Sequence, residues 1–340
     1  MDNIKLISGT SHPDLAISIS KHLRTPLSEC ILEKYGNTEI KVELKENIRN
    51  KDIFIIQTGS YNNELGYSIN DHLMETLIII DACKRSMAKT ITLIMPFYPY
   101  SRQDKKNESR APITAKLIAN ILETSGIDRI VIMDLHAPQI QGFFNIPVDN
   151  IYAMPLLIHK LNEMYLNNMT LEEMQSKFVL VGPDAGSIKR IIKFSKVMKL
   201  DPLFMHKQRN YKNSKIIDSM MLVGDKNLVK NKIAIVIDDI CDTGGTLIKC
   251  CDILHKYGAK EIICVVTHNI LSNNAIDLFN QYEHISKLIV SNTLPQNKHM
   301  RKCDKIEVFD VSNLFAKVIS CIVTGDSISK LFLSKVYKQV

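Results

Sequence analysis

The fold is decided by the stretch Val236-Ile237-Asp238-Asp239-Ile240-Cys241-Asp242-Thr243-Gly244-Gly245-Thr246-Leu247, an apolar run followed by two carboxylates and a Thr/Gly turn. Residues 233–237 (IAIVI) are apolar and mostly β-branched, which is typical of a buried strand, and residues 247–257 favour a helix. The turn therefore connects the end of a strand to the N-terminus of a helix, as the repeating connections of α/β folds do.

The Thr/Gly turn has the chemistry of an anion site. The first backbone N–H groups of a helix have no partner within it, and the helix dipole favours a negative charge beside them. Gly244 and Gly245 let the backbone approach a ligand closely, and Thr243 and Thr246 add hydroxyl donors. We expect a phosphate monoester to bind there.

The two adjacent carboxylates, Asp238 and Asp239, cannot themselves bind phosphate. They are suited to accept hydrogen bonds from vicinal ribose hydroxyls, or to hold a Mg²⁺ ion. The alternative is an acidic turn that only caps a helix. Two acids at the end of a buried strand would then repel each other without a hydroxyl or cationic partner. The stretch therefore predicts a site for a phosphorylated sugar.

Short apolar strands alternate with amphipathic helices along the whole chain, which predicts an α/β fold with mostly parallel sheets flanked by helices. The expected strands are residues 5–8, 53–57, 91–95, 130–133, 178–181, 233–237 and 262–266. The expected helices include residues 13–23, 70–85, 112–123, 186–199 and 247–257.

The length of the chain, 340 residues, is too great for one ordinary core and favours two domains. The strand and helix pattern weakens between residues 147 and 177, so we expect domains at 1–150 and 151–340. Acids follow strands in both halves, which makes a duplicated α/β unit plausible. Ligands of open α/β sheets bind beyond the carboxyl ends of the strands, where these acids lie.

The composition limits the class of partner. The formal net charge is +7, but the basic residues are dispersed along the chain rather than grouped in blocks. Tryptophan is absent and aromatic residues make up 6% of the chain, so stacking platforms for bases are scarce. Both observations argue against nucleic acid as a partner.

The cysteines and the apolar runs bear on the compartment. Eight cysteines form no C-x-x-C pair, which favours reduced thiols over zinc ligands or a disulfide framework. MDNIKLISGTSH lacks the pattern of a signal peptide, and no apolar run approaches the roughly 20 residues that span a bilayer. We expect a cytoplasmic protein with no membrane partner.

A second strand, residues 130–133, ends in the segment Asp134-Leu135-His136. Side chains two apart on extended backbone lie on one face, so Asp134 and His136 could together ligate a metal or contact a nucleotide phosphate. The simpler interpretation is a histidine that is hydrogen-bonded at a strand end. The polar residues of QIQGFF, which follow at once, favour a binding site.

Two cationic segments lie elsewhere in the chain. In PFYPYSRQDKK, Arg102 offers a planar fork for phosphate oxygens, with Lys105 and Lys106 as further charges. Such a segment alone is more often a solvated loop. Residues 206–215 (HKQRNYKNSK) are polar and carry four positive charges between two apolar segments. They suit a mobile lid that carries Lys207 and Arg209, or else a surface hairpin.

The nucleotide motifs G-x-x-x-x-G-K-[ST] and G-x-G-x-x-G do not occur in the sequence. Any nucleotide must therefore be held outside those two frameworks.

Taken together, these motifs resemble the ribose-phosphate diphosphokinase (phosphoribosyl pyrophosphate synthetase) family. The loop VIDDICDTGGTL is similar to the phosphoribosyl diphosphate loop of type I phosphoribosyltransferases. Similar segments extend from residue 8 to about residue 332: SGTSHPDLA, NDHLMETLIIIDACKR, PYSRQDKK, APITAKLIANILETSG, MDLHAPQIQGFFNIPVDNIYA, GPDAG, HKQR and GDSISKLF. HKQR and GDSISKLF look most like the eukaryotic members of the first, phosphate-regulated class.

The resemblance implies two tandem domains of the type I phosphoribosyltransferase kind. It implies a Mg²⁺-dependent reaction in which ATP and ribose 5-phosphate give 5-phosphoribosyl 1-diphosphate and AMP, for nucleotide biosynthesis. The anomeric hydroxyl attacks the β-phosphorus of ATP, and a diphosphoryl group moves. It also implies a homo-oligomer, a hexamer assembled from dimers, with sites completed across subunits.

The resemblance also implies roles for individual residues. The positions that match the ribose 5-phosphate loop are Asp238, Asp239, Asp242, Thr243, Gly244, Gly245 and Thr246. The positions that match ATP contacts are Arg102, Gln103, Asp104 and His136, with Tyr35, Asn37 and Glu39 on a loop that reaches a neighbouring subunit's adenine. Those that match Mg²⁺ sites are His136 and Asp184, with Asp134 nearby as a third candidate. Lys207 and Arg209 match the catalytic pair of a flexible loop.

The chain departs from the family pattern in several places. Ser187 stands where a second glycine usually follows GPDAG, and it could crowd a phosphate. The stretch 207–224 is longer than usual, Asn145 stands where Asp is common, and residues 61–68 are an insertion. At the family's regulatory phosphate/ADP site Arg49, Ser327, Ser329 and Phe332 match, whereas Asn47 and Met87 do not.

Two other functions compete with this one. Ser187 and the altered lid would suit a non-catalytic subunit that associates with such a synthetase, although the charged site residues are all present. A true phosphoribosyltransferase would use the same loop to consume phosphoribosyl diphosphate with a base. Such chains usually have a single domain, and the Arg102 and MDLHA segments would remain unexplained.

Overall fold

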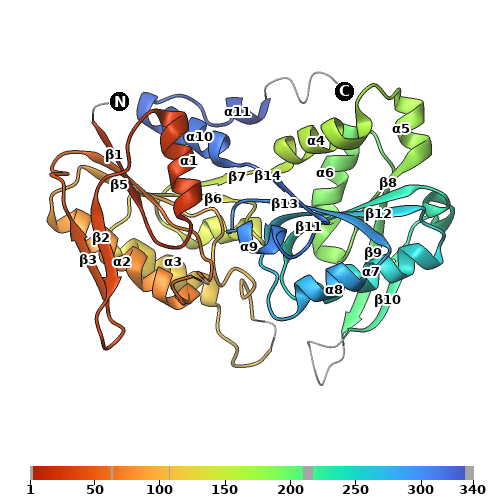
Figure 1. Ribbon diagram of the computed structural model, residues 1–340, viewed down its shortest axis with the longest axis horizontal. Coiled ribbons are helices and arrows are strands. Elements are labelled where there is room, and N and C mark those ends of the chain that lie inside the picture. Colours follow the sequence, from red (N-terminus) through yellow and green to blue (C-terminus); the bar gives the residue numbers. More distant parts are fainter. Residues whose placement is uncertain (1–2, 63, 107, 210–216, 334–340) are drawn as a thin grey trace. The chain divides into compact units, whose positions relative to one another are not determined.

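The computed structural model describes residues 3–62, 64–106, 108–209 and 217–333, which form two compact α/β units (Figure 1). The first unit contains the chain up to Tyr152, together with Asn292–Pro295 and Asp310–Phe332. The second contains Ala153–Ser291 and Gln296–Phe309. Mostly parallel sheets flanked by helices were predicted, and this fold class is confirmed.

The first unit is built on a five-stranded parallel sheet with the order β1-β4-β5-β6-β7. Its strands are β1 (Ile4–Ser8), β4 (Asp52–Ile56), β5 (Thr90–Ile94), β6 (Arg129–Met133) and β7 (Val148–Ile151). The inner strands are apolar and buried along most of their length because helices cover both faces of the sheet.

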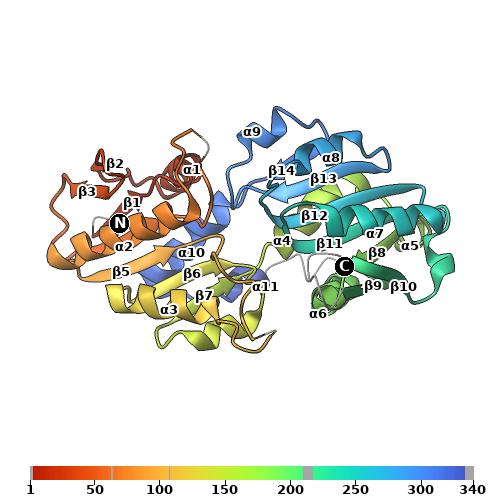
Figure 2. The same cartoon turned by 90° about the horizontal axis from the view of Figure 1, so that it is seen from below.

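The helices of the first unit divide between the two faces of its sheet (Figure 1). α1 (Pro13–Leu23) packs against α10 (Ser312–Thr324) on one face, so a segment from the end of the chain completes this unit. α2 (Ile69–Arg85) and α3 (Thr114–Ser125) lie on the other face and come to the front in Figure 2.

An antiparallel hairpin of β2 (Cys30–Lys34) and β3 (Ile40–Leu44) stands apart from the main sheet and packs on α2. The hairpin was not predicted. Its apolar residues Ile31, Leu32 and Val42 are separated by Glu and Lys, so no apolar run marks the two strands.

The second unit has a seven-stranded sheet with the order β10-β9-β8-β11-β12-β13-β14. All neighbouring strands are parallel except β9 and β10, which pair as an antiparallel hairpin. The strands are β8 (Phe178–Gly182), β9 (Pro202–Arg209), β10 (Ile217–Val223), β11 (Ile233–Cys241), β12 (Glu261–Asn269), β13 (Ile285–Ser291) and β14 (Ile306–Phe309).

The helices of the second unit also cover both faces of their sheet (Figures 1 and 2). On one face lie α4 (Met154–Leu161), α5 (Leu171–Lys177) and α6 (Ile188–Met198), and on the other lie α7 (Gly245–Lys256) and α8 (Ala275–Gln281). The short helices α9 (Asn297–Met300) and α11 (Lys330–Leu333) complete the described chain.

The strand order of the second unit reverses between β8 and β11. After β8 the chain continues to β9 on one side, and it then returns to place β11 on the other side of β8. Connections that leave in opposite directions open a crevice at the carboxyl ends of the two strands, which is where ligands of open α/β sheets bind.

Strand β11 extends to Cys241, so the prediction that it ends at Ile237 was wrong. β12 is equally long and continues the ladder, with Asp238 opposite Val266 and Ile240 opposite His268. A strand with a paired neighbour can continue through polar residues, because the ladder satisfies its backbone groups. The two acids therefore lie on a rigid strand rather than in a turn.

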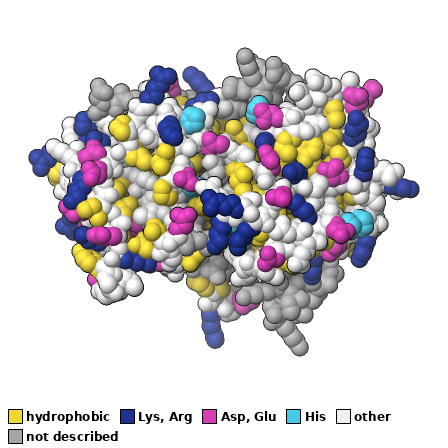
Figure 3. Space-filling model, in the orientation of Figure 1, with side chains coloured by type: hydrophobic (Ala, Val, Ile, Leu, Met, Phe, Trp, Pro, Cys, Tyr) yellow, Lys and Arg dark blue, Asp and Glu magenta, His cyan; other side chains and the backbone are white. Residues whose placement is uncertain are grey.

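The surface agrees with the dispersed charge of the sequence. On the face shown in Figure 3, Lys and Arg side chains are spread over both units, with Asp and Glu among them. All eight cysteines carry free thiols, as predicted. None of the helices in the described residues is long and apolar enough to cross a membrane.

Candidate active site

The Thr/Gly turn joins β11 to α7, as predicted, and Gly244 is the N-cap of that helix. Gly244 has a φ of +77°, and a Cβ there would lie 2.9 Å from Cε2 of Phe279. Glycine alone fits this position without strain. Gly244 contributes no capping side chain to α7, and the N-terminus of a helix favours an anion beside it.

Backbone hydrogen bonds from the loop after β12 support the turn. The amides of Ile270 and Ser272 donate to the carbonyls of Cys241 and Asp242, at 2.8 and 3.0 Å. The loop that follows β12 therefore supports the turn. Thr243 is exposed and Thr246 is half-buried, so both lie within reach of a ligand at the surface.

Asp238 and Asp239 are accompanied by a cation that the sequence did not reveal. Arg190, on α6, places its Nη1 atom 3.5 Å from Oδ1 of Asp238 and 3.3 Å from Oδ1 of Asp239. Burial raises the pKa of the Asp238 carboxyl well above its usual value, the charge of Asp239 raises it further, and Arg190 acts in the opposite direction. The predicted repulsion between the two acids is thus partly offset inside the protein.

Asp184 and Ser187 lie at the carboxyl end of β8, on the other side of the topological switch. The amide of Ser187 donates to Oδ1 of Asp184 at 3.1 Å, and the Ser187 hydroxyl donates to the carbonyl of Asp184 at 2.6 Å. Ser187 is buried, and its Oγ lies beneath Gly182. The Ser187 hydroxyl thus points into the turn, and whether Ser187 crowds a bound phosphate stays a prediction.

In the first unit, the segment after β5 is anchored by aromatic residues. Phe97 and Tyr98 are buried, and the Tyr98 hydroxyl donates to the carbonyl of Ala115 at 2.9 Å. Arg102 and Gln103 follow at the surface, where both are exposed. A rigid apolar exit from the strand therefore presents the guanidinium and the amide outward, as an ATP contact requires.

Asp104 connects this segment to the end of the neighbouring strand. The Gln139 side-chain amide donates to Oδ2 of Asp104 at 3.1 Å, and Gln139 lies in the short 3₁₀ helix Pro138–Phe143 after β6. Just before that helix, Leu135 is buried, whereas His136 is exposed and Asp134 is half-buried. The structure thus places the predicted Arg102 and His136 segments at the carboxyl ends of the adjacent strands β5 and β6.

Asp134 adopts an uncommon backbone conformation, with a φ of +40°. A side chain other than glycine in this region is strained, and such strain often marks functional positions. The amides of Asp134 and Leu135 donate to the Ile151 carbonyl and to Oδ1 of Asn150, at 2.9 and 3.1 Å. These two hydrogen bonds to residues of β7 hold the turn after β6 in place.

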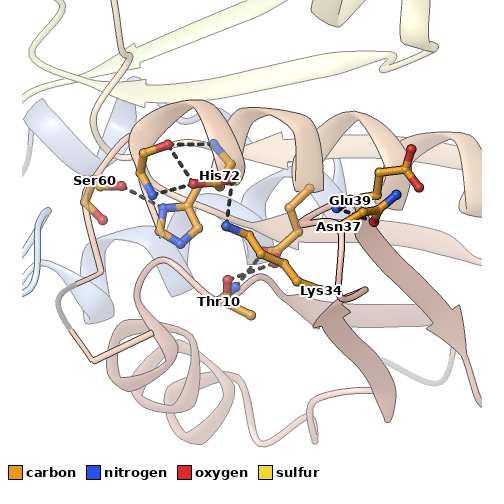
Figure 4. A network of polar contacts seen from close by, with 9 residues as sticks. Thr10, Lys34, Asn37, Glu39, Ser60 and His72 are labelled. Atoms are coloured by element: carbon orange, nitrogen blue, oxygen red, sulfur yellow. Dashed lines mark hydrogen bonds and ion pairs between the residues drawn. The ribbon is translucent and has the colours of Figure 1, made fainter. Parts of the chain in front are cut away.

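Tyr35, Asn37 and Glu39 lie at the exposed tip of the β2–β3 hairpin, and Figure 4 shows Asn37 and Glu39 there. Oδ1 of Asn37 accepts a hydrogen bond from the amide of Glu39 at 3.2 Å, which shapes the tip. The Tyr35 side chain is 54% exposed. Lys34, the last residue of β2, pairs with Asp71 of α2 at 2.8 Å and so fixes the tip end of the hairpin to that helix (Figure 4). A rigid hairpin with an exposed aromatic tip suits a contact with another molecule.

The predicted catalytic pair lies on the β9–β10 hairpin. Lys207 and Arg209 belong to β9, opposite Met220 and Ile217 of β10. Their side chains lie outside the described residues, as do residues 210–216 of the predicted lid. The other prediction for this segment was a surface hairpin. The antiparallel pairing of β9 with β10 agrees with it.

The candidate Mg²⁺ ligands were tested by their donor chemistry. Within residues 3–62, 64–106, 108–209 and 217–333, no group of three or more His, Cys, Asp or Glu could hold a metal ion. Mg²⁺ usually takes one or two carboxylates, and substrate phosphates and water supply its other ligands. The carboxylates of Asp134 and Asp184 fit that use, and His136 is a less typical ligand for this hard cation.

The residues of the predicted regulatory site fall on two segments of the first unit. Arg49 lies in a turn where its amide donates to Oδ1 of Asn47 at 3.0 Å, and the next residue, Asn50, bonds to the carbonyl of Met87. Ser327 and Ser329 are exposed beyond α10, where Phe332 packs edge-on against Tyr152. The regulatory role of these residues remains a prediction.

The fold and the site together define an α/β protein with the architecture of the phosphoribosyltransferase class, in which two adjacent acids and a Thr/Gly turn lie at a topological switch point. The N-terminal domain model of ribose phosphate pyrophosphokinase matches residues 4–126. The model of the phosphoribosyl synthetase-associated domain matches residues 202–333.

Named relatives are similar over nearly their whole length. Ribose-phosphate pyrophosphokinase 4 of Saccharomyces cerevisiae is 45% identical over 98% of this chain and 95% of its own. Ribose-phosphate pyrophosphokinase 2 of Schizosaccharomyces pombe is 43% identical over 97% and 98%. The crystal structure of phosphoribosylpyrophosphate synthetase from Mycobacterium smegmatis superposes with a TM-score of 0.84, at 37% identity, over 95% of this chain and 99% of that one. The chain belongs to the ribose-phosphate pyrophosphokinase family.

Proposed function

We propose that this chain is an active ribose-phosphate diphosphokinase that converts ATP and ribose 5-phosphate to 5-phosphoribosyl 1-diphosphate and AMP. The observation that carries the proposal is the full-length family similarity of a chain that also retains the charged side chains of both half-sites. The Asp238–Thr246 loop lies at the switch point of the second unit, and the Arg102 and His136 segments end adjacent strands of the first.

The ribose 5-phosphate half-site is assigned to the β11–α7 connection. The first-turn amides of α7, with the hydroxyls of Thr243 and Thr246, hold the 5-phosphate. Asp238 and Asp239 accept hydrogen bonds from the ring hydroxyls, because carboxylates on a rigid strand can fix the orientation of a vicinal diol. Asp242 completes the loop. The anomeric hydroxyl of the sugar is thereby presented to the second substrate.

The ATP half-site is assigned to Arg102, Gln103, Asp104 and His136. Arg102 contacts phosphate oxygens through its planar fork, and Gln139 holds Asp104 in place. We assign Tyr35, Asn37 and Glu39 to the adenine of ATP on a neighbouring subunit, because the exposed hairpin tip can reach a second copy of the chain. This assignment makes the enzyme a homo-oligomer, and a hexamer built from dimers is the proposed assembly.

The chemical step needs alignment and charge neutralisation rather than a covalent nucleophile on the protein. The anomeric oxygen forms a bond to the β-phosphorus, and the bond from that phosphorus to the oxygen bridging to the α-phosphate breaks. AMP leaves with the bridging oxygen, and the anomeric hydroxyl loses its proton. Lys207 and Arg209 neutralise charge on the transferred group as it crosses.

Mg²⁺ is the proposed cofactor, with Asp134, His136 and Asp184 as its candidate protein contacts. When bound, the ion offsets phosphate charge and orients the phosphate chain. We further propose a cytoplasmic enzyme of nucleotide biosynthesis. Its two domains meet near residue 150, and its regulatory site contains Arg49, Ser327, Ser329 and Phe332.

The reaction is tested directly by product analysis. Purified full-length protein with ATP, ribose 5-phosphate and Mg²⁺ should yield AMP and 5-phosphoribosyl 1-diphosphate in equal amounts. Production of ADP, or of no AMP, would refute the proposal. Inclusion of inorganic phosphate or ADP in parallel reactions tests the regulatory assignment.

Lys207→Ala tests the role of the β9–β10 hairpin. Because the lid contact forms mainly in the transition state, kcat should fall by roughly 10² to 10³ while the KM for ATP changes little. A parallel rise in the KM for ATP would show that Lys207 instead anchors ATP in the ground state.

The competing function is a non-catalytic subunit, and the buried, hydrogen-bonded hydroxyl of Ser187 argues against one of the two reasons for it. Turnover by the isolated chain at a rate typical of metabolic enzymes would exclude it. Activity that appears only when a second, homologous chain is added would support it.

A further inference from the structure

Arg190 forms ion pairs with both acids of the pair, and it lies on α6 just after the GPDAG segment. Within the described chain, its Nη1 atom lies between the two carboxylates, at 3.5 and 3.3 Å from their Oδ1 atoms. The side chains of Arg190, Asp238 and Asp239 are 23%, 13% and 7% exposed. The cation therefore approaches the pair from the helix side, in a mostly desolvated place.

The arrangement fixes the orientation of the carboxylates as well as their charge. Oδ1 of Asp238 also accepts the amide of Asp239 at 2.9 Å, so one oxygen of this carboxylate is held by both the backbone and Arg190. A carboxylate that is held through one oxygen can rotate little. A planar guanidinium can contact both acids at once, whereas an ammonium ion offers a point charge.

Negative charge gathers around Asp238 and Asp239, so a neighbouring cation stabilises the two carboxylates. Asp184, from the β8–α6 connection, adds a third negative charge that Asp238 senses, and Arg190 is the cation that opposes it. A ribose hydroxyl donates its hydrogen bond best to an ionised carboxylate. Arg190, at 3.5 and 3.3 Å from the pair, therefore offsets part of the negative charge that Asp238, Asp239 and Asp184 bring together.

We propose that Arg190 is a positioning residue that holds the carboxylates of Asp238 and Asp239 in the orientation that receives the hydroxyls of ribose 5-phosphate. The proposal rests on the function proposed above, since it assigns Arg190 to the sugar half of that site. Arg190 acts through the two carboxylates, so its loss should weaken the sugar contact and leave the ATP contact intact.

The test compares three variants of the full-length protein. Arg190→Met removes the charge, and Arg190→Lys keeps the charge without the fork. Lys189→Met is the matched control, because Lys189 is the preceding residue of the same helix and is exposed. Steady-state kinetics give KM for each substrate, and calorimetry gives the affinity for ribose 5-phosphate alone.

Arg190→Met should raise the KM for ribose 5-phosphate by about tenfold or more, with the KM for ATP within about twofold. Arg190→Lys should recover part of this loss, and Lys189→Met should match the wild type. If Arg190→Met does not fold, Arg190→Lys decides the question, because it should show the same split between the two KM values at smaller size.

Two results would overturn the proposal. An equal rise in both KM values, or a rise for ATP alone, would show that Arg190 binds phosphate or only supports the fold. Unchanged kinetics in an active enzyme would show that the ion pair has no role in sugar binding. Failure of the wild type to form AMP would instead refute the proposed function, so the two failures are distinguishable.

Discussion

The carboxyl group of Asp238 lies where its burial disfavours the charged form. Its pKa is raised mainly by burial and then by the charge of Asp239. The folded state therefore binds this proton more tightly than the unfolded chain does. The free energy of unfolding falls as the pH rises from the ordinary value for Asp, roughly 3.9, through the raised value. Burial therefore disfavours the ionised form of this carboxyl group in the folded protein.

Asp238→Asn should accordingly stabilise the ligand-free protein at pH 7, by on the order of 1 kcal/mol, because the amide is neutral and can still accept the Asp239 amide. The same variant should lose most of its activity. Thermal melts at pH 7 and pH 5 measure the effect, and the gain should shrink at the lower pH. A lower melting temperature at pH 7 would contradict the argument.

Ser187 is a departure from the family that the structure explains. Its hydroxyl donates to the Asp184 carbonyl and its amide donates to Oδ1 of Asp184, so it stabilises the turn between β8 and α6. A glycine there would supply the amide but not the hydroxyl bond.

Ser187→Gly should therefore leave both KM values within about twofold while it lowers the free energy of unfolding by about 1 kcal/mol, from the lost hydrogen bond and the added backbone freedom. Ser187→Ala separates these contributions, since it removes the hydroxyl alone. A marked fall in the KM for either substrate in Ser187→Gly would show that the hydroxyl does obstruct a ligand.

The place of Asp238 and Asp239 towards the end of a strand, and of the Thr/Gly turn between that strand and a helix, could be predicted because one short segment contains all the signals. Asp238, Asp239 and the Thr/Gly turn are contiguous in sequence. Arg190 could not be predicted, because it approaches from 48 positions away and lies in a helix with several other cations. Its only sequence signal is its place one turn into the helix that follows GPDAG. The proposed roles of all these residues await the tests above.

At the scale of elements, the connection from β11 to α7 depends on one left-handed residue. Gly244 combines a φ of +77° with close contact to the ring of Phe279. Gly325, the C-cap of α10, has nearly the same φ, +75°, but a Cβ there would meet nothing within 4 Å. Substitutions at these two positions can therefore be compared to separate the cost of backbone strain from the cost of steric crowding.

Gly244→Ala should raise the KM for ribose 5-phosphate and lower the melting temperature, with a cost of about 1–3 kcal/mol from strain together with the crowding of Phe279. Gly325→Ala should cost only the strain, about 1 kcal/mol, and should leave the kinetics unchanged. Equal effects of the two variants would show that the contact with Phe279 is unimportant.

The elements themselves were predictable where apolar runs or amphipathic periodicity are long. The limits of α1 agree with the expected residues 13–23, and β11 begins at the expected residue. The end of β11 was not predictable, because its continuation depends on pairing with β12. The β2–β3 hairpin and the edge strand β10 were missed for a related reason, since their residues are partly exposed and mix polar with apolar side chains.

At the scale of the molecule, the first unit is joined by contacts between segments that are distant in sequence. His12, in the loop after β1, makes a 3.0 Å hydrogen bond from Nε2 to the carbonyl of Asn292. Desolvation by burial lowers the pKa of His12 to about 4. The unfolded chain, with an ordinary pKa near 6.5, thus binds the proton more readily than the folded protein does. Stability that is present above about pH 6.5 is lost as the pH falls towards 4.

His12→Gln should therefore weaken the dependence of the melting temperature on pH between about 4 and 6.5. The wild type should lose up to about 3 kcal/mol through this one group across that interval, and Gln cannot titrate while its amide can still donate to Asn292. His22→Gln is the control, since His22 is exposed on α1. Identical pH profiles for wild type and His12→Gln would contradict the prediction.

The α/β class of the molecule could be predicted from the alternation of strands and helices, and its family could be predicted from motifs spread along the chain. Which segments of the chain make up each of the two units could not be predicted from the sequence. Nothing in the apolar run of residues 314–323 indicates that α10 pairs with α1, about 300 positions earlier. Such a pairing depends on tertiary contacts, and the periodicity of one segment does not indicate which other segment it contacts.

The return of α10 to the first unit has a consequence for how the chain is made. A ribosome releases the N-terminal residues first, yet α1 must wait for its partner until the whole of Ala153–Ser291 has been synthesised. Domains usually fold in the order of their synthesis. Here the first unit is completed only after Asp310–Phe332, which contains α10, has been synthesised. A nascent chain interrupted before residue 312 would leave α1 uncovered, and quality control could recognise its apolar face.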